Sequence, residues 1–352
     1  MTTRPAVVAG VDCTPRSVAV LRWADAQARL MDAQLVAVTA WGTGEIGDRF
    51  GVGVRGSAER SLEASLAQAL PPDRAGPVVR RVVPLTPVEA LTRLNGDVAL
   101  VVVGGRHPRL RPLASVAGGV VSAAGCPVAI VSGPPEPPSG RIVVGVDGTA
   151  RGWPALSWAL AQARRTGAKV DAVLAWRWAP AYAVHPYGSV TEEQRDAEQQ
   201  LIAQLSELDE DERSLVRPLA IEGHPAGVLL EVAAGADLVV VGSRGAGPVA
   251  GRVLGSTSQE LVHRCPVPLV VVPHVTHGAP VAGRCIIGSG EAEEMTNSTG
   301  TIELSLDRTE LTLLRNALET YIADFGHDEA EIRLAAQRLL SRIPAAAPAE
   351  PV

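Results

Sequence analysis

The sequence predicts an α/β protein with two tandem open parallel-sheet domains followed by a small C-terminal helical hairpin. A segment of domain size is repeated, because Gly10-Val11-Asp12 recurs as Gly145-Val146-Asp147, 135 positions later. Trp23 recurs as Trp158 at the same distance. In both copies short apolar runs alternate with segments of helical periodicity, which is typical of parallel sheets covered by helices. Two amphipathic segments follow the copies and favour a helical hairpin.

The repeat is a duplicated domain rather than a solenoid unit. Solenoid repeats recur every 20–50 residues, far less than the spacing seen here. Later matches keep nearly the same distance: Val101-Val102-Val103-Gly104 recurs as Val239-Val240-Val241-Gly242, 138 positions on. Cys126-Pro127-Val128 recurs as Cys265-Pro266-Val267, 139 positions on. The chain of 352 residues is long enough for two such domains and an appendage.

In the second copy each element follows from its local pattern. Residues 142–146 form a short β-branched apolar run, which predicts a buried strand. The next segment places Leu156, Ala159, Leu160 and Ala163 at helical spacing. The full alternation predicts strands at 142–146, 170–176, 216–221, 237–241 and 269–272, and helices at 153–165, 192–208, 225–234 and 255–264. Ligands of such sheets bind beyond the carboxyl ends of the strands, where the strand order reverses.

The same patterns set the expected domain boundaries. Residues 5–132 form domain 1, 133–140 a proline-rich linker and 141–273 domain 2. Residues 274–300 are turn-rich and are expected to be a flexible tether. Residues 301–343 predict an edge strand and two helices, the first carrying Leu311, Leu314, Leu318 and Ile322 as an apolar stripe. The Ala/Pro-rich end, 344–352, is expected to be disordered.

Composition excludes several classes of function. A formal net charge of −6 leaves no basic face for nucleic acid, and no apolar run has the length of a membrane span. Four cysteines without CxxC spacing indicate a reduced, cytoplasmic protein. Lys169 is the single lysine, so a Walker A loop is absent. His274 and His277 have a spacing that metal ligands can use, but no acidic or Cys partner is near, so we expect neither a metal site nor a catalytic residue.

A glycine-rich stretch in domain 2 has the chemistry of a phosphate site. Gly242 and Gly245 follow a predicted strand and allow the backbone to approach a ligand closely. Gly255 and Ser256 begin a predicted helix, where free N–H groups and the helix dipole favour an anion. Asp147 ends the first strand of the domain, at the same edge of the sheet, where a carboxylate can accept from a ribose hydroxyl or a base amino group.

The spacing Gly242-x2-Gly245-x9-Gly255-Ser256, combined with the strand that ends in Asp147-Gly148, resembles the universal stress protein family. Residues 5–273 look like a tandem member. The resemblance implies an adenine nucleotide alpha hydrolase-like fold and, in the nucleotide-binding branch, bound ATP with or without Mg²⁺. Other adenine nucleotides (ADP, AMP or cyclic AMP) fit the same pattern. Asp147 would then lie near adenine and ribose, Ala175 would offer backbone contacts to the base, and the glycine motif would surround the phosphates. The implied binding residues are Val146, Asp147, Gly148, Ala175, Gly242, Arg244, Gly245, Gly255, Ser256 and Thr257.

Domain 1 departs from this motif. His107 stands where Gly245 stands, and counting nine further residues puts Ala117-Gly118 in place of Gly255-Ser256. A non-glycine residue held in the left-handed region costs ~1–2 kcal/mol. Asp12 is retained but is followed by Cys13 instead of glycine. The sequence therefore predicts one working nucleotide site, in domain 2, with domain 1 mainly structural.

Three functions remain open at this stage. The first is a non-catalytic ATP-binding module that acts in a stress response or in signalling. The second is a slow ATPase, disfavoured because no lysine or acidic pair accompanies the phosphate loop. The third is an interaction scaffold that binds no nucleotide. We expect strands 128–131 and 269–272 to pair within the chain as an internal pseudo-dimer, and the C-terminal helices to offer a surface for a protein partner.

Overall fold

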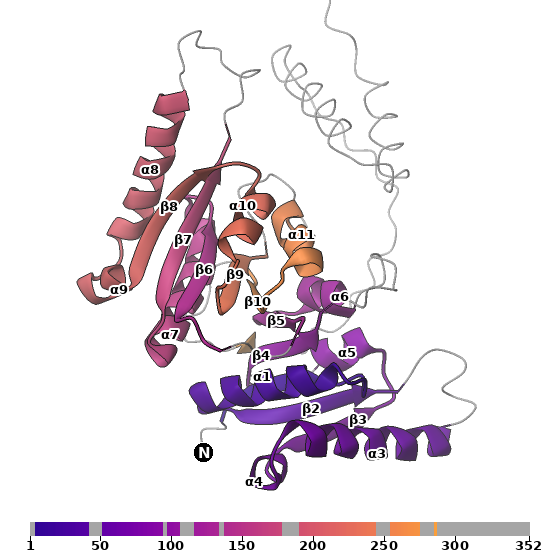
Figure 1. Ribbon diagram of the computed structural model, residues 1–352. Coiled ribbons are helices and arrows are strands. Elements are labelled where there is room, and N and C mark those ends of the chain that lie inside the picture. Colours follow the sequence, from indigo (N-terminus) through magenta and orange to yellow (C-terminus); the bar gives the residue numbers. More distant parts are fainter. Residues whose placement is uncertain are drawn as a thin grey trace, which may run out of the picture. The chain divides into compact units, whose positions relative to one another are not determined.

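The computed structural model describes residues 4–41, 51–93, 97–105, 116–133, 137–177, 190–243, 254–274 and 285–286 (Figure 1). The linker is described from residue 137 onward. The appendage expected at 301–343 and the end at 344–352 lie outside the described residues. So do the two site candidates Arg244 and Gly245, and His107 of domain 1.

The first half alternates strands and helices. Its elements are β1 (Ala6–Gly10), α1 (Ser17–Leu30), β2 (Gln34–Ala40), α3 (Gly51–Ala69), α4 (Pro72–Ala75), β3 (Val79–Val83), α5 (Pro87–Thr92), β4 (Asp97–Gly104), α6 (Val116–Ala123) and β5 (Val128–Val131). Thr86 and Glu89 form a reciprocal capping box at the start of α5. A threonine three residues before a glutamate is the sequence pattern of such a cap.

The second half repeats this order, and all five strands predicted for it are present. Its elements are β6 (Arg141–Val146), η2 (Ala150–Gly152), α7 (Trp153–Thr166), β7 (Lys169–Trp176), α8 (Val190–Ser206), α9 (Glu210–Leu215), β8 (Val216–Glu222), α10 (Pro225–Val232), β9 (Leu238–Gly242), α11 (Ser256–Arg264) and β10 (Leu269–Val272). The sequence analysis missed α9. Its signal was Asp209, whose carboxylate accepts from the Glu212 N–H at 2.7 Å and caps the helix.

The described strands form one sheet rather than two separate ones. Their order is β3-β2-β1-β4-β5-β10-β9-β6-β7-β8. Within each half all pairings are parallel, as predicted. The strand order reverses between β1 and β4 in the first half and between β6 and β9 in the second. These two places are where ligands of an open parallel sheet bind.

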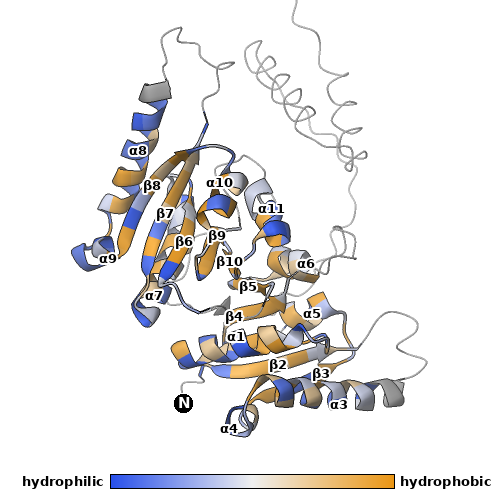
Figure 2. Cartoon of the chain, in the orientation of Figure 1, coloured by the Kyte–Doolittle hydropathy of each residue, from blue (hydrophilic) through white to orange (hydrophobic). Residues whose placement is uncertain are grey.

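Helices cover both faces of the sheet with apolar side chains. Leu21 of α1 and Leu156 of α7 belong to one buried cluster, while Val120 of α6 and Leu261 of α11 belong to the other. Strands β4 and β9 are largely hydrophobic in Figure 2, whereas α8 alternates between polar and apolar residues. Strands that are buried on both faces read as continuous apolar runs in the sequence, which is why they were predictable.

The two halves meet through a symmetric antiparallel pairing of β5 and β10. Val270 lies opposite Ala129, Leu269 opposite Ile130 and Val271 opposite Val128. The pairing of these two strands is the one predicted from the sequence. A second contact obeys the same symmetry, because Gln162 Nε2 of α7 donates to Gln27 Oε1 of α1 at 3.0 Å, and the two residues are 135 positions apart.

One sequence-based interpretation needs correction. The Val239 N–H donates to the Pro268 carbonyl where the Val101 N–H donates to the Pro127 carbonyl. Pro127 therefore corresponds to Pro268, 141 positions on, and not to Pro266.

Within the range 274–300, expected from the sequence to be a tether, Cys285–Ile286 form β11, which pairs antiparallel with the start of β4.

Candidate functional site

The candidate site lies at the carboxyl ends of β6 and β9, where the strand order of the second half reverses. Val143 and Val144 of β6 pair with Val239 and Val240 of β9, so the residues that follow these two strands emerge at the same edge. Val146 ends β6 and Gly242 ends β9. Helix η2, just after Asp147, also contacts β9. The fold thus brings the Asp147 turn to the strand that leads into the glycine motif.

Asp147 uses only one of its two carboxylate oxygens within the protein. Oδ1 accepts from the Thr149 N–H at 3.0 Å and from Thr149 Oγ1 at 2.7 Å. Oδ2 is buried and has no hydrogen-bond partner. Most buried polar atoms are hydrogen-bonded, and one left without a partner costs free energy. The unused oxygen is an acceptor for a donor supplied from outside the chain.

Two features of the turn favour glycine at position 148. Its φ of +70° lies in the left-handed region that favours glycine. A Cβ at this position would also lie 3.2 Å from both Leu174 Cδ1 and Gln200 Oε1. The turn therefore packs closely against β7 and α8.

Two hydrogen bonds hold the two ends of the glycine loop together, and a third ties the loop to β10. The Gly255 N–H donates to the Ser243 carbonyl at 2.9 Å, and Ser258 Oγ donates to the Gly242 carbonyl at 2.6 Å. The Ser243 N–H donates to the Val272 carbonyl of β10 at 2.8 Å. These bonds fix where the loop leaves β9 and where it enters α11. Arg244 and Gly245 lie between them, outside the described residues.

The start of α11 has the backbone arrangement of an anion site. Gly255 is extended, with φ −64° and ψ 149°, and its residue type supplies no side-chain cap. Ser256 is exposed and Thr257 is half-buried, whereas Ser258 is buried. The N–H groups of a first helical turn have no partner within the helix, and the helix dipole adds partial positive charge there. An anion such as a phosphate fits this end of the helix.

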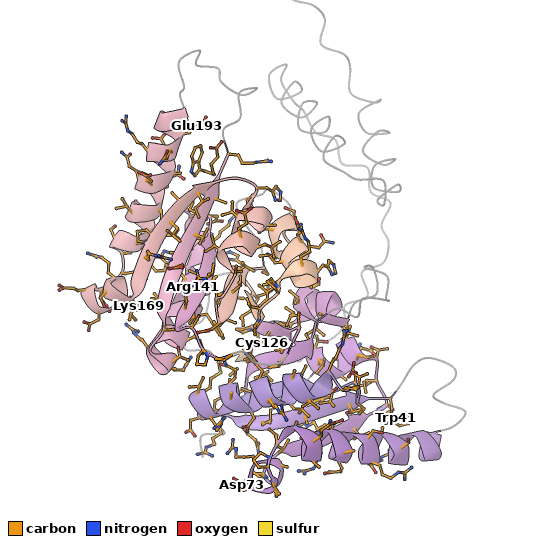
Figure 3. All side chains as sticks on the ribbon, viewed as in Figure 1. Trp41, Asp73, Cys126, Arg141, Lys169 and Glu193 are labelled. Carbon is orange, nitrogen blue, oxygen red and sulfur yellow. The ribbon has the colours of Figure 1, made fainter. Side chains whose placement is uncertain are left out.

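Ala175 lies where the sequence placed it, near the carboxyl end of β7. Its neighbour Leu174 pairs with Val146 of β6, and Ala175 itself pairs with Ile221 of β8. The single lysine lies at the other end of this strand. Lys169 Nζ donates to the Ser214 carbonyl of α9 at 3.1 Å, remote from Glu193 at the start of α8 (Figure 3). Lys169 therefore does not contribute charge to the candidate site.

In the corresponding turn of the first half, one oxygen of the aspartate accepts a third hydrogen bond. Asp12 Oδ1 accepts from the Thr14 N–H at 3.0 Å, from Thr14 Oγ1 at 2.8 Å and from Ser17 Oγ at 2.6 Å. Burial acts to raise the pKa of Asp12, but the hydrogen bonds from Ser17 and Thr14 outweigh burial and lower that pKa overall. Cys13 takes the place of Gly148 and keeps a left-handed φ of 58°.

The expected correspondence of Ala117-Gly118 with Gly255-Ser256 is wrong. Helix α6 buries Ala117, Val120 and Val121, and α11 buries Ser258, Leu261 and Val262, which sets an offset of 141 positions. Gly255-Ser256 then corresponds to Ala114-Ser115, outside the described residues. The first half has a shorter loop after Gly104, so a count of nine residues overshoots.

Sequence reasoning missed four residues around the site. Gly152 and Gln204 pack beside the Asp147 turn: a Cβ on Gly152 would lie 3.0 Å from Gln204 Nε2 and 3.3 Å from Asp147 Oδ1. Gln204 Nε2 donates to the Thr149 carbonyl at 3.1 Å. Ser243 Oγ accepts from the His274 N–H at 3.2 Å, so His274 lies at the base of the loop. Gly152 could have been found from the repeat, because it lies 135 positions after Ser17 and therefore takes the place of that serine in the second copy.

Within the described parts of the chain, no group of three or more His, Cys, Asp or Glu side chains gathers in a way that could hold a metal ion. No helix in those same parts combines the length and the apolar composition that crossing a bilayer requires. The described cysteines Cys13, Cys126 and Cys265 are free thiols.

Comparison with known proteins matches the described fold. A model of the universal stress protein family matches residues 4–132 and 138–273. Two universal stress proteins of Mycobacterium tuberculosis are 29% and 30% identical over 283 and 294 residues, covering 75% of this chain and 96% and 95% of the relatives. A solved universal stress protein from Archaeoglobus fulgidus has a TM-score of 0.56 at 20% identity, over 77% of this chain and 97% of that one. One from Pseudomonas aeruginosa has a TM-score of 0.51 at 14% identity, over 77% and 94%.

Proposed function

Since the chain belongs to the universal stress protein family, we propose that its second half binds an adenine nucleotide, ATP above all. The proposed protein is non-catalytic and acts in a stress response or in signalling. Nucleotide binding would stabilise the folded, nucleotide-bound form, and a protein partner would recognise a surface of that form. The site consists of the Asp147 turn for base and ribose and the glycine loop with the start of α11 for phosphates.

One observation carries the proposal: Asp147 Oδ2 is buried without a partner at the point where the strand order reverses. A carboxylate oxygen accepts hydrogen bonds and cannot donate them when ionised. Ribose hydroxyls and the amino group of adenine are donors of the required kind. In the corresponding turn of the first half Asp12 Oδ1 accepts one further hydrogen bond, from Ser17, and Asp12 has no buried oxygen without a partner.

The phosphate part of the proposal rests on the clamped loop and on α11. Gly242 and Gly255 are held at the two ends of the loop by the hydrogen bonds of Ser243 and Ser258. Ser256 and Thr257 open the helix with backbone N–H groups and hydroxyls. Arg244 and Gly245 complete the proposed phosphate contacts from the sequence motif. Mg²⁺ would then be held mainly by the phosphates and water, since it usually keeps several waters.

A slow ATPase is the second candidate, and the described residues disfavour it. Phosphoryl transfer needs positive charge and a group that orients the attacking water. Lys169 bonds to Ser214 at the far end of β7, and the described residues hold no acidic cluster for a metal. Phosphate release measured with Asp147→Ala as a control distinguishes the candidates: turnover that this variant abolishes would favour the ATPase.

The nucleotide proposal is tested by releasing and identifying small molecules retained by the purified full chain. We expect an adenine nucleotide by mass spectrometry, and binding of added ATP to the emptied protein by calorimetry. Gly245→Val, which blocks close approach of the loop, and Ser256→Ala should both weaken that binding. If no adenine nucleotide is retained and none binds at millimolar concentration, the interaction scaffold is the better reading.

We also propose that the two halves act as an internal pseudo-dimer. The β5–β10 pairing and the contact between Gln27 and Gln162 share one approximate two-fold relation, which supports this arrangement. A partner protein bound through the C-terminal helices is part of the proposal from the sequence. A cytoplasmic location is proposed too, because the free thiols of Cys13, Cys126 and Cys265 suit a reducing compartment.

A further inference from the structure

Helix α8 corresponds to α3 of the first half, but the two helices carry different residues at the position beside the aspartate turn. Helix α3 buries Leu62, Ser65 and Leu66, and α8 buries Leu201, Gln204 and Leu205, so the two patterns coincide with an offset of 139. Gln204 therefore occupies the position of Ser65. In α3, Ser65 Oγ only donates back to the Ser61 carbonyl of its own helix, at 2.9 Å.

A second exchange lies directly opposite. Helices α1 and α7 bury matching positions with an offset of 135, and Gly152 occupies the position of Ser17. The first half thus has Ser17 and Ser65, and the second half has Gly152 and Gln204. The two exchanges compensate in volume, because the glycine leaves room for the glutamine amide: Gln204 Nε2 lies 3.0 Å from where a Gly152 Cβ would be.

The exchange also changes which group is hydrogen-bonded. Ser17 Oγ donates to the Asp12 carboxylate, whereas Gln204 Nε2 donates to the Thr149 carbonyl and leaves Asp147 alone. The orientation of the Gln204 amide follows from chemistry, because a carbonyl oxygen only accepts and must face the NH₂ group. Gln204 is only 6% exposed, and its Oε1 has no partner. Two buried acceptors therefore have no partner here: Oδ2 of Asp147 in the turn, and Oε1 of Gln204, which packs against that turn.

We propose that Gln204 is a positioning residue of the nucleotide site, and that its hydrogen bond to the Thr149 carbonyl holds the Asp147 turn so that the unpartnered Oδ2 of Asp147 can take a ligand donor. Gln204 supports the turn through its main chain, at Thr149, instead of through the carboxylate. The ligand class is one that presents an N–H or O–H donor to Asp147, such as a ribose hydroxyl or a base amino group. This inference rests on the proposed nucleotide function.

The decisive variant transfers the first-half arrangement into the second half as Gly152→Ser/Gln204→Ser in the full chain. The new serine hydroxyl should donate to Asp147 Oδ1, as Ser17 donates to Asp12 Oδ1, while the bond from residue 204 to the Thr149 carbonyl is lost. The turn is then no longer held at Thr149, and we expect its ATP affinity by calorimetry to fall about tenfold or more. The variant should fold, because the first half already has this pair of serines around a turn of the same shape.

Measurements without nucleotide separate positioning from plain packing. The double variant should keep the melting temperature of the empty protein or raise it, while ATP affinity falls. A residue that only fills space would lower both. Gln204→Met keeps most of the volume but cannot donate to Thr149, so it too should weaken ATP binding. The matched control is the reverse exchange Ser17→Gly/Ser65→Gln in the first half, which should leave ATP affinity unchanged.

Two failures are distinguishable. If the unaltered chain binds no nucleotide, the proposed function fails first. If the unaltered chain binds ATP and both Gly152→Ser/Gln204→Ser and Gln204→Met bind it within twofold of that affinity, the positioning role is overturned while the nucleotide site stands.

Discussion

Two turns of the same backbone shape, Asp12-Cys13-Thr14 and Asp147-Gly148-Thr149, differ in what their carboxylates bind. In both, the aspartate accepts from the threonine two residues later, and the middle residue is left-handed. In the first half Ser17 adds a third donor to Asp12. In the second half Gly152 supplies none, and one oxygen of Asp147 stays without a partner. The two copies of the domain therefore differ in the hydrogen bonding of the same aspartate, and only the second has a buried oxygen without a partner on it.

The comparison shows that the same aspartate can have different surroundings in two copies of one domain. Asp12 follows β1 as Asp147 follows β6, yet Asp12 Oδ1 accepts an extra hydrogen bond of 2.6 Å from Ser17. A buried oxygen without a partner is found on Asp147 and not on Asp12. The presence of an aspartate alone is thus a weak sign of function, and the residues that surround it decide.

The largest expected effect is a loss of ATP affinity when Asp147 is replaced, in contrast to the replacement of Asp12. Asp147→Ala should weaken ATP affinity between tenfold and a hundredfold, because a hydrogen bond to a charged group is worth about 1.5–3 kcal/mol. Asp12→Ala should leave ATP affinity within about twofold of the unaltered chain. Calorimetry of both variants measures this directly. Equal losses from the two substitutions, or a stoichiometry of two, would end the claim that only the second half binds.

The place where the halves meet should give the next largest effect. Gln27 and Gln162 are buried, and Oε1 of Gln162 already lacks a partner. Gln27→Ala removes the acceptor of the Gln162 amide, so the free energy of unfolding should fall by about 1–3 kcal/mol in urea titrations. Gln27→Leu/Gln162→Leu removes both partners and should cost much less. If Gln27→Ala lowers the free energy of unfolding no more than a surface substitution does, this contact does not join the halves.

The left-handed residues of the two turns should respond in opposite directions. Gly148→Ala should lower the free energy of unfolding by about 1–2 kcal/mol, because alanine is strained at φ +70° and its Cβ approaches Leu174. Cys13→Gly relieves the strain at φ 58°, but glycine loses more backbone entropy on folding, so a gain below about 1 kcal/mol is expected. Chemical unfolding of both variants checks the pair, and a loss of stability in Cys13→Gly would contradict it.

The sequence predicted the strands well, because their signal is local and strong. Strands buried on both faces read as apolar runs, and 269–272 was placed at its observed bounds. The glycine at 148 and the aspartate at 147 were also identified. Helix α9 was missed because it is short and mostly polar and has no buried residue, and only the cap at Asp209 marks it.

The parts of the site that escaped prediction depend on contacts between distant residues. Gln204 is 55 positions from Thr149, and nothing in its local sequence indicates that its amide reaches that carbonyl. The correspondence of the two loops failed for a related reason. Loop length changed between the copies, and only the burial pattern of α6 and α11 restores the alignment. The repeat does place Gly152 at the position of Ser17. That exchange points to the site only when the structure shows that Ser17 donates to Asp12.

The smallest expected effect concerns the bond that closes the first turn. Ser17→Ala removes one donor from Asp12 and should lower the free energy of unfolding by about 1 kcal/mol at neutral pH, a modest value because the carboxylate is half exposed. Hydrogen bonds hold the pKa of Asp12 below the 3.8 of a free aspartate. Its contribution to stability is therefore present above that value and is lost as the pH falls through the folded-state pKa.

The difference between Ser17→Ala and the unaltered chain should accordingly shrink as the pH falls below about 4. Ser65→Ala is the matched control, because its hydroxyl bonds only to the neutral Ser61 carbonyl and its effect on unfolding should not depend on pH in this range. Urea unfolding at a series of pH values from 7 to 3 measures both. If the difference in unfolding free energy for Ser17→Ala stays constant across the series, Ser17 acts by packing and not through the Asp12 carboxylate. The contrast between Asp12 and Asp147 would then lose its support in the first half.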